Sequence, residues 1–193
     1  AEQLPCVFHV SARTVSTHAL NIFGDHSDVM ACRQTGFAML CEGNVQEVMD
    51  LSPVAHLAAL SGKVPFINFF DGFRTSHEIQ KIAVWDYKDL ADMCDMDAVK
   101  AFREHALNPE HPAMRGSHEN GDTFFQHREA CNQYYDALPE VVEKYMGKIN
   151  EKLGTDYKLF NYYGAPDADR VIIAMGSICD VAEEVIDYLN AHG

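Results

Sequence analysis

Three arginines are the clearest candidates for chemistry, because each comes a few residues after a short apolar run. They are Arg13, Arg33 and Arg74. If the runs are parallel strands, three guanidinium groups lie near the carboxyl ends of one sheet, where open α/β sheets bind ligands. Arginine offers a carboxylate or a phosphate two parallel N–H donors. The pattern favours a site for a small anion, while pairing with a local carboxylate such as Asp28 or Asp71 remains the alternative.

The overall charge makes these arginines more conspicuous. The chain has 193 residues, of which 15 are basic and 29 acidic, for a net charge of −14, and 47% are hydrophobic. Such a composition supports a packed core and disfavours disorder. It also argues against a nucleic acid or an anionic membrane as partner, because both require clustered lysine and arginine. No apolar run approaches the ~18 residues of a membrane span, and no signal peptide is recognisable.

Other chemistries find less support. The six cysteines form no CxxC pair, which disfavours zinc and iron–sulfur sites and indicates free thiols in a reducing, cytoplasmic setting. Ser76 and His77 are neighbours, but no GxSxG motif accompanies them, and we expect Thr75 or Ser76 to cap a helix. No phosphate-binding GxGxxG or P-loop is present. The helical region carries several histidines at spacings that disfavour a metal site, namely His105, His111, His118 and His127.

The elements that must position the arginines alternate between strand and helix in the first 70 residues. Strands are expected at residues 6–10, 37–41 and 63–70, with a short helix at 14–23 and an extended piece at 28–32. A long helix begins at Asn44, with Glu47 in a capping-box position, and Pro53 should kink or split it. This alternation predicts a sheet that is at least partly parallel.

The second half of the chain is mainly helical. Helical patterns dominate residues 87–153, with the best helix at 139–153 and Gly154 as its C-cap. Residues 169–175 then form an expected strand, and Ser177 should cap a final helix. One strand and one helix cannot close a core, so this unit is expected to open a second domain whose remainder lies elsewhere.

Long collinear strings resemble the single-chain pyruvate:ferredoxin (flavodoxin) oxidoreductases over essentially the whole chain. They are VFHVSARTVSTHALNIFGDHSDVMACRQTGFAMLCEGNVQEVMDL, VPFINFFDGFRTSHEIQKI, FFQHREACNQYYDALPEVVEKYM and FNYYGAPDADRVIIAMGS. The resemblance implies oxidative decarboxylation of pyruvate to acetyl-coenzyme A. It implies an α/β fold with a mostly parallel sheet flanked by helices, like the pyrimidine-side domain of thiamine enzymes, and then a truncated second α/β domain. Ser11 and Pro53 depart from the family pattern.

The resemblance also implies where the parts of such an enzyme lie. Residues 1–158 correspond to the later part of the pyrimidine-side thiamine domain, and 159–193 to the start of core domain II. The family's HVxAR motif ends here at Arg13, which should contact the substrate carboxylate. The glutamate that activates the cofactor should lie upstream of this segment.

The parent enzyme is expected to use thiamine diphosphate, magnesium and [4Fe-4S] clusters, none held by this segment alone. Its expected partners are pyruvate, coenzyme A, ferredoxin or flavodoxin, and its own other domains, in a cytoplasmic homodimer. Two alternatives remain open at this point. One is a non-catalytic interaction subunit of a thiamine-dependent enzyme, and the other is a metal-dependent hydrolase.

Overall fold

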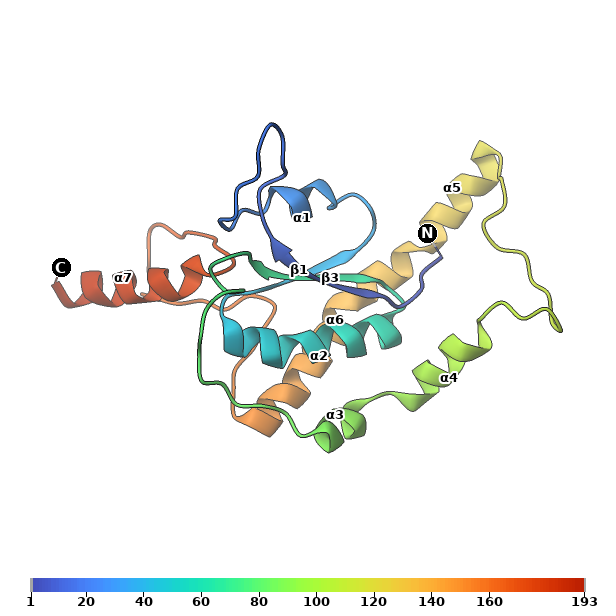
Figure 1. Ribbon diagram of the computed structural model, residues 1–193. Helices are drawn as coiled ribbons and strands as arrows, with labels where there is room; N and C mark the ends of the chain where they lie inside the picture. The colour runs from blue at the N-terminus through green and yellow to red at the C-terminus, as the bar shows by residue number, and fades with distance from the viewer. Residues whose placement is uncertain (1, 193) are drawn as a thin grey trace.

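A three-stranded parallel sheet forms the centre of the molecule. The computed structural model describes residues 2–192. Strands β1 (Val7–Ala12), β2 (Ala38–Glu42) and β3 (Phe66–Asp71) lie in the order β1-β3-β2 (Figure 1). Both pairings are parallel, with β3 between its two neighbours. The sheet is flanked by helices, which confirms the predicted α/β fold class.

The buried apolar run at residues 63–70 becomes the central strand. Phe66, Ile67 and Phe69 are only 2%, 5% and 1% exposed to solvent. Alternate side chains of a strand point to opposite faces. Phe66 therefore packs in one core with α2 and α6, whereas Ile67 and Phe69 pack in a second core with Val29 of α1. Apolar residues at nearly every position are typical of a strand covered on both faces.

Helix α2 (Val45–Gly62) begins as the sequence predicts. The Asn44 side chain accepts the Glu47 N–H at 3.0 Å, and the Glu47 carboxylate accepts the Gly43 N–H at 2.6 Å. These two bonds form a variant of the capping box, shifted by one residue at its second contact. The expected split at Pro53 is wrong, because α2 is one continuous helix of 18 residues that includes Pro53. Burial of Val54, Ala55 and the following apolar residues against the sheet outweighs the missing N–H.

Helix α6 (Asn132–Leu153) packs against α2. It begins seven residues before Pro139, so the prediction of a helix starting at Pro139 is wrong at that end. Gly154 adopts the left-handed conformation with φ 71°, as predicted for the C-cap. The two helices approach closely at Gly62, where a Cβ would lie 2.8 Å from Leu138 Cδ1.

Two short segments between β1 and β2 differ from the prediction. Residues 28–32, expected to be extended, belong to helix α1 (Ser27–Ala31), and residues 14–23 contain no helix. In the second segment the Val15 N–H bonds to the Ser27 hydroxyl, and the Phe23 N–H bonds to the Asn21 side chain. Side chains that satisfy backbone donors in this way compete with helix formation.

Three further helices lie away from the sheet. Helices α3 (Tyr87–Met93), α4 (Met96–Glu104) and α5 (Gly121–Ala130) have no buried residue, and Figure 1 shows α3 and α4 along the outside of the molecule. Residues 72–77 form turns, so the helix expected to begin at Thr75 or Ser76 is absent. No helix within residues 2–192 is both long and apolar enough to cross a membrane.

Within residues 159–192, the C-terminal unit contains one helix and no strand. Helix α7 (Ile178–His192) follows the expected position, but the strand expected at residues 169–175 is wrong. Val171, Ile172 and Ile173 are 65%, 90% and 89% exposed. A strand needs a neighbour to receive its backbone hydrogen bonds. Among residues 2–192, none pairs with this run.

Candidate functional site

The three strands end at one edge of the sheet, which we call the carboxyl edge. Because all three strands are parallel, their last residues Ala12, Glu42 and Asp71 lie side by side at this edge. Arg13, Gly43 and Gly72 immediately follow them. The sequence analysis predicted a ligand site at such an edge.

Arg13 is held at the carboxyl edge through its backbone, while its guanidinium has no partner within residues 2–192. The Arg13 N–H donates to Asp28 Oδ2 at 3.0 Å, and Arg13 forms an isolated bridge with Gly24. No ion pair within the described part of the chain involves Arg13, and its Nε is buried without a hydrogen-bond partner. Within residues 2–192 the Arg13 side chain thus forms no ion pair with Asp28 or Asp71. A buried donor without a partner costs free energy and favours an external acceptor.

The other two arginines differ in position. Arg33 follows α1 and precedes β2, so it lies toward the opposite edge of the sheet, where its Nη1 donates to the Met30 carbonyl at 2.8 Å. Its predicted place at the carboxyl edge is wrong, because residues 28–32 are helical and reverse the chain. Arg74 is exposed and lies in the turn that follows β3. The structure thus brings Arg13 and Arg74, but not Arg33, to the carboxyl edge.

Asp71 connects the carboxyl edge to two distant segments, which the sequence did not reveal. It accepts hydrogen bonds from His26 Nε2 at 2.5 Å, from the Ser177 N–H at 2.8 Å and from the Ser177 hydroxyl at 2.5 Å. Burial acts to raise the pKa of Asp71, but the bonds from Ser177 and His26 outweigh it and lower the pKa. No local sequence pattern marks this role of Asp71, because His26 and Ser177 lie 45 and 106 residues away along the chain.

Gly176 completes this junction by giving Asp71 room. It has φ +84°, and a Cβ there would lie 3.0 Å from both carboxylate oxygens of Asp71. Left-handed backbone and close approach both favour glycine at this position. Ser177, expected to cap the last helix, donates its side-chain hydroxyl to Asp71 instead.

Glu42 is a second acid at the carboxyl edge that the sequence analysis missed. Its side chain is fully buried, and neither carboxyl oxygen has a hydrogen-bond partner. Burial, together with the nearby charge of Glu47, raises the pKa of Glu42 to about 9. Glu42 therefore carries a proton at neutral pH.

A buried amide lies on the same face of the sheet as Glu42. Asn68 pairs in register with Leu40, two residues before Glu42, and its Oδ1 has no donor. Its Nδ2 donates to Ser52 Oγ at 3.1 Å and lies 3.0 Å from His9 Nδ1. Glu42 and Asn68 are thus two buried polar side chains on this face whose oxygen atoms lack partners within residues 2–192.

The remaining candidates do not assemble into a site. Ser76 Oγ lies 2.9 Å from His77 Nδ1, but within residues 2–192 no carboxylate orients that histidine. No three His, Cys, Asp or Glu side chains gather around a metal position within the same residues. Of the four histidines in the helical region, His127 pairs with Glu119 at 2.6 Å.

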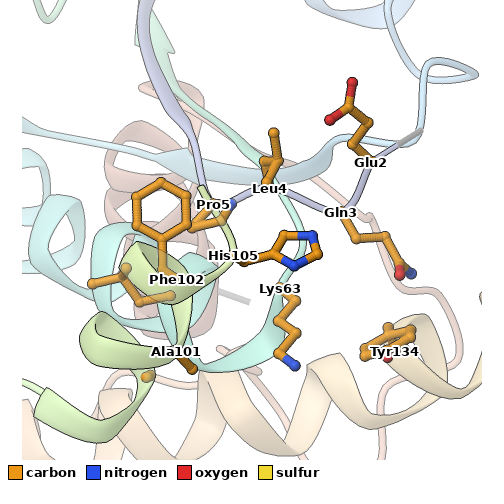
Figure 2. Close-up of a pocket in the computed structure, with 11 residues that line it drawn as sticks. Glu2, Gln3, Leu4, Pro5, Lys63, Ala101, Phe102, His105 and Tyr134 are labelled. Carbon is orange, nitrogen blue, oxygen red and sulfur yellow. The ribbon is translucent and has the colours of Figure 1, made fainter. Parts of the chain in front are cut away.

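A small pocket lies away from the carboxyl edge. It is lined by residues 2–5, by the end of α2 with Lys63, and by α4 with Phe102 and His105 (Figure 2). Lys63 precedes the start of β3, so the pocket lies at the opposite end of the strands from Arg13. Its volume is about 170 Å³. None of the predicted site residues lines it.

Comparisons with known proteins identify one family. The family model described as pyruvate flavodoxin/ferredoxin oxidoreductase, thiamine diphosphate-binding, matches residues 1–147. The chain is 64% identical over 192 residues to the pyruvate-flavodoxin oxidoreductase of Enterobacter agglomerans. It is 61% identical over the same length to the pyruvate:ferredoxin oxidoreductase of Moorella thermoacetica. Each match covers 100% of this chain and 16% of the relative. The pyruvate dehydrogenase [NADP(+)] of Cryptosporidium parvum is 50% identical over 188 residues, which are 97% of this chain and 10% of that protein.

Proposed function

Because the chain belongs to the pyruvate flavodoxin/ferredoxin oxidoreductase family, we propose that it is a segment of an enzyme that oxidatively decarboxylates pyruvate. Pyruvate and coenzyme A give acetyl-coenzyme A, carbon dioxide, one proton and two electrons, and ferredoxin or flavodoxin accepts the electrons. The names of the relatives support this reaction. The chain spans about a sixth of their length, so other parts of the parent complete the enzyme.

Arg13 holds the carboxylate of pyruvate in this proposal. The observation that carries it is the guanidinium at the carboxyl edge, which has a buried, unpartnered Nε and no ion pair within residues 2–192. A planar two-pronged donor fits a carboxylate and orients the adjacent keto group.

Thiamine diphosphate fits this edge through its organic part rather than through its diphosphate. The Asp71 carboxylate would repel phosphate, whereas the neutral Glu42 offers an unpartnered, buried polar group. When bound, the cofactor supplies the carbanion chemistry that decarboxylation needs. We assign magnesium, the diphosphate, the [4Fe-4S] clusters and coenzyme A to parts of the parent outside this chain.

We further place a domain boundary near residue 158, with residues 159–193 opening core domain II. The family model ends at residue 147, and the apolar side chains of residues 171–173 and α7 are exposed, which supports this division. A cytoplasmic homodimer is the proposed state of the parent. The cysteines support a reducing compartment, since all six are free thiols.

Replacing Arg13 in the full-length parent tests the proposal. Arg13→Ala should raise the KM for pyruvate by about tenfold to a hundredfold, because a charge-assisted hydrogen bond contributes about 1.5–3 kcal/mol. Arg13→Lys should raise it less. Arg33→Ala is the matched control, since Arg33 lies toward the opposite edge, and its KM should equal that of the wild type. An unchanged KM in Arg13→Ala would sink the assignment.

The isolated chain provides a second test. It should reduce no dye when pyruvate is added, because most of the cofactor site lies in other parts of the parent. Pyruvate-dependent dye reduction by the pure chain would contradict the proposal that other parts of the parent supply most of the cofactor site.

A further inference from the structure

Gly72 lies directly beneath the side chain of Arg13. A Cβ at position 72 would lie 2.4 Å from Arg13 Cγ and 2.7 Å from Arg13 Nε. It would also lie 2.5 Å from the Ala12 carbonyl oxygen. Real Cβ atoms essentially never approach other heavy atoms closer than 3.0 Å. Any side chain at position 72 must therefore push Arg13 away from its present place.

Space, rather than backbone conformation, requires glycine at this position. Gly72 is not among the glycines with positive φ, so alanine could adopt its backbone angles. The Gly72 N–H also donates to the Ala12 carbonyl at 2.8 Å, which fixes the distance between the end of β1 and the end of β3. The Arg13 side chain fills the room left by the missing Cβ.

Arg13 has little freedom to avoid such a Cβ. Its N–H is bound to Asp28 Oδ2, and its backbone bridges to Gly24. A Cβ at Gly24 would itself lie 3.2 Å from Asp71 Cβ and 3.3 Å from the Gly72 carbonyl oxygen. The backbone is thus confined on both sides, so a new methyl group strains the Arg13 side chain as well as the contact with the Ala12 carbonyl.

We propose that Gly72 is a positioning residue for the anion site, because its missing side chain forms the surface on which Arg13 lies when it holds the substrate carboxylate. This inference rests on the proposed function of Arg13 and extends it to the residue that sets its geometry. A displacement of the stem is carried to the guanidinium at its end. A misplacement of about 1 Å in a positioning group can cost on the order of a hundredfold in rate.

The first test compares two glycine-to-alanine substitutions in the full-length parent. Gly72→Ala should raise the KM for pyruvate by about tenfold or more and change kcat less, because the displaced group binds the substrate carboxylate. Gly147→Ala is the matched control, since a Cβ at Gly147 meets nothing within 4 Å. Its KM and kcat should equal those of the wild type.

A double substitution separates positioning from a general structural role. If Gly72 acts through Arg13, then Gly72→Ala should add almost nothing to the KM of Arg13→Ala, whereas independent effects would multiply. If Arg13→Ala alone leaves the KM unchanged, the proposed function fails. If Arg13→Ala raises the KM but Gly72→Ala does not, or multiplies it again in the Arg13→Ala background, only the role of Gly72 is overturned.

Folding supplies a readout even if the single variant is unstable. Two of the three close contacts of the new Cβ are with the Arg13 side chain beyond its own Cβ. Removing that side chain relieves them, so the Arg13→Ala/Gly72→Ala enzyme should unfold at a higher temperature than Gly72→Ala. A double variant no more stable than Gly72→Ala would overturn the proposed contact.

Discussion

Two apolar runs of this chain have the composition of a buried strand, but only one becomes a strand. Most of residues 63–70 belong to the central strand β3 (Phe66–Asp71), in which Phe66 is 2% exposed. Residues 169–175 pair with no strand within residues 2–192, and Ile172 is 90% exposed. The difference lies in their neighbours. β3 has β1 and β2 beside it and helices over both faces, which satisfy its backbone and cover its side chains.

The helices next to these two runs along the chain, α2 before the first and α7 after the second, differ in the same way. Helix α2 buries eight residues against the sheet and α6, whereas α7 buries none. On α7 the apolar side chains recur at helical spacing and are at least half exposed: Ile178, Val181, Val185 and Leu189. An exposed apolar surface of this kind is typical of an interaction surface. It supports the proposal that sequence outside this chain completes the C-terminal unit.

The largest expected difference between the two runs is in core stability. Phe66→Ala should lower the free energy of unfolding of this chain by about 3–5 kcal/mol, because it leaves a cavity in the main core. Ile172→Ala should change it by less than about 0.5 kcal/mol. Urea unfolding followed by circular dichroism measures both. In the full-length parent, Ile172→Ala should become destabilising if residues 169–175 gain a partner strand there. If Phe66→Ala and Ile172→Ala lower the free energy of unfolding of this chain equally, the contrast between the two runs is wrong.

A buried acid and an exposed acid sharpen the same contrast through pH. Burial raises the pKa of Glu42 from 4.5 to about 9, so between these values the folded chain keeps a proton that the unfolded chain releases. Stability contributed by that proton is complete below pH 4.5 and is lost as the pH rises toward 9. Glu42→Gln removes this loss and should stabilise the chain by roughly 3 kcal/mol at pH 7.

The same substitution should have no effect at pH 4, where Glu42 is neutral in both states. Thermal unfolding between pH 4 and pH 8 measures how the stability of each variant changes with pH. Glu184→Gln, on the exposed face of α7, removes a carboxylate without burying or exposing any group and is the matched control. If the stability of Glu42→Gln changes with pH in parallel with that of the wild type, the Glu42 carboxyl is ionised in the folded chain and the prediction is wrong.

Two tyrosines that donate to aspartates give a smaller contrast. The Tyr157 hydroxyl donates to Asp50 Oδ2 at 2.8 Å beside the core, and Asp50 is 2% exposed. The Tyr163 hydroxyl donates to Asp187 Oδ1 at the same distance, but on the exposed surface of α7. Tyr157→Phe should cost about 2 kcal/mol, because it removes a partner from a buried carboxylate. Tyr163→Phe should cost less than about 0.5 kcal/mol, and equal costs in urea unfolding would remove the distinction.

The sequence predicted the elements whose signals are local. The apolar run of β3, the Asn44 start of α2 and the Gly154 end of α6 depend on neighbouring residues, and all three are confirmed. Residues 28–32 were assigned the wrong structure because a single helical turn and a short strand have similar apolar patterns. Residues 169–175 have the local pattern of a strand, but a strand also depends on what lies beside it.

The candidate site was predictable only in part, for a similar reason. Arg13 was found from its place after a strand and from a sequence motif, and the structure brings it to the carboxyl edge. Glu42 and Asp71 gave no signal, because their roles depend on burial and on partners far along the chain. The space at Gly72 likewise depends on how closely β1 and β3 approach.

The smallest expected effect concerns the contact that joins the two regions. Ser177 donates its hydroxyl to Asp71 at the carboxyl edge, and its N–H donates to the same carboxylate. Ser177→Ala removes the first bond and keeps the second, so the loss of stability should be about 1 kcal/mol or less. Because these bonds help lower the pKa of Asp71, their stabilisation is present above pH 3.8 and is lost as the pH falls through the lowered pKa.

The stability of Ser177→Ala should therefore lie below that of the wild type at pH 7 and converge with it in strong acid. The exposed Ser16→Ala control should match the stability of the wild type throughout. A Ser177→Ala effect that is the same at every pH would mean that Asp71 does not hold the C-terminal unit through its charge.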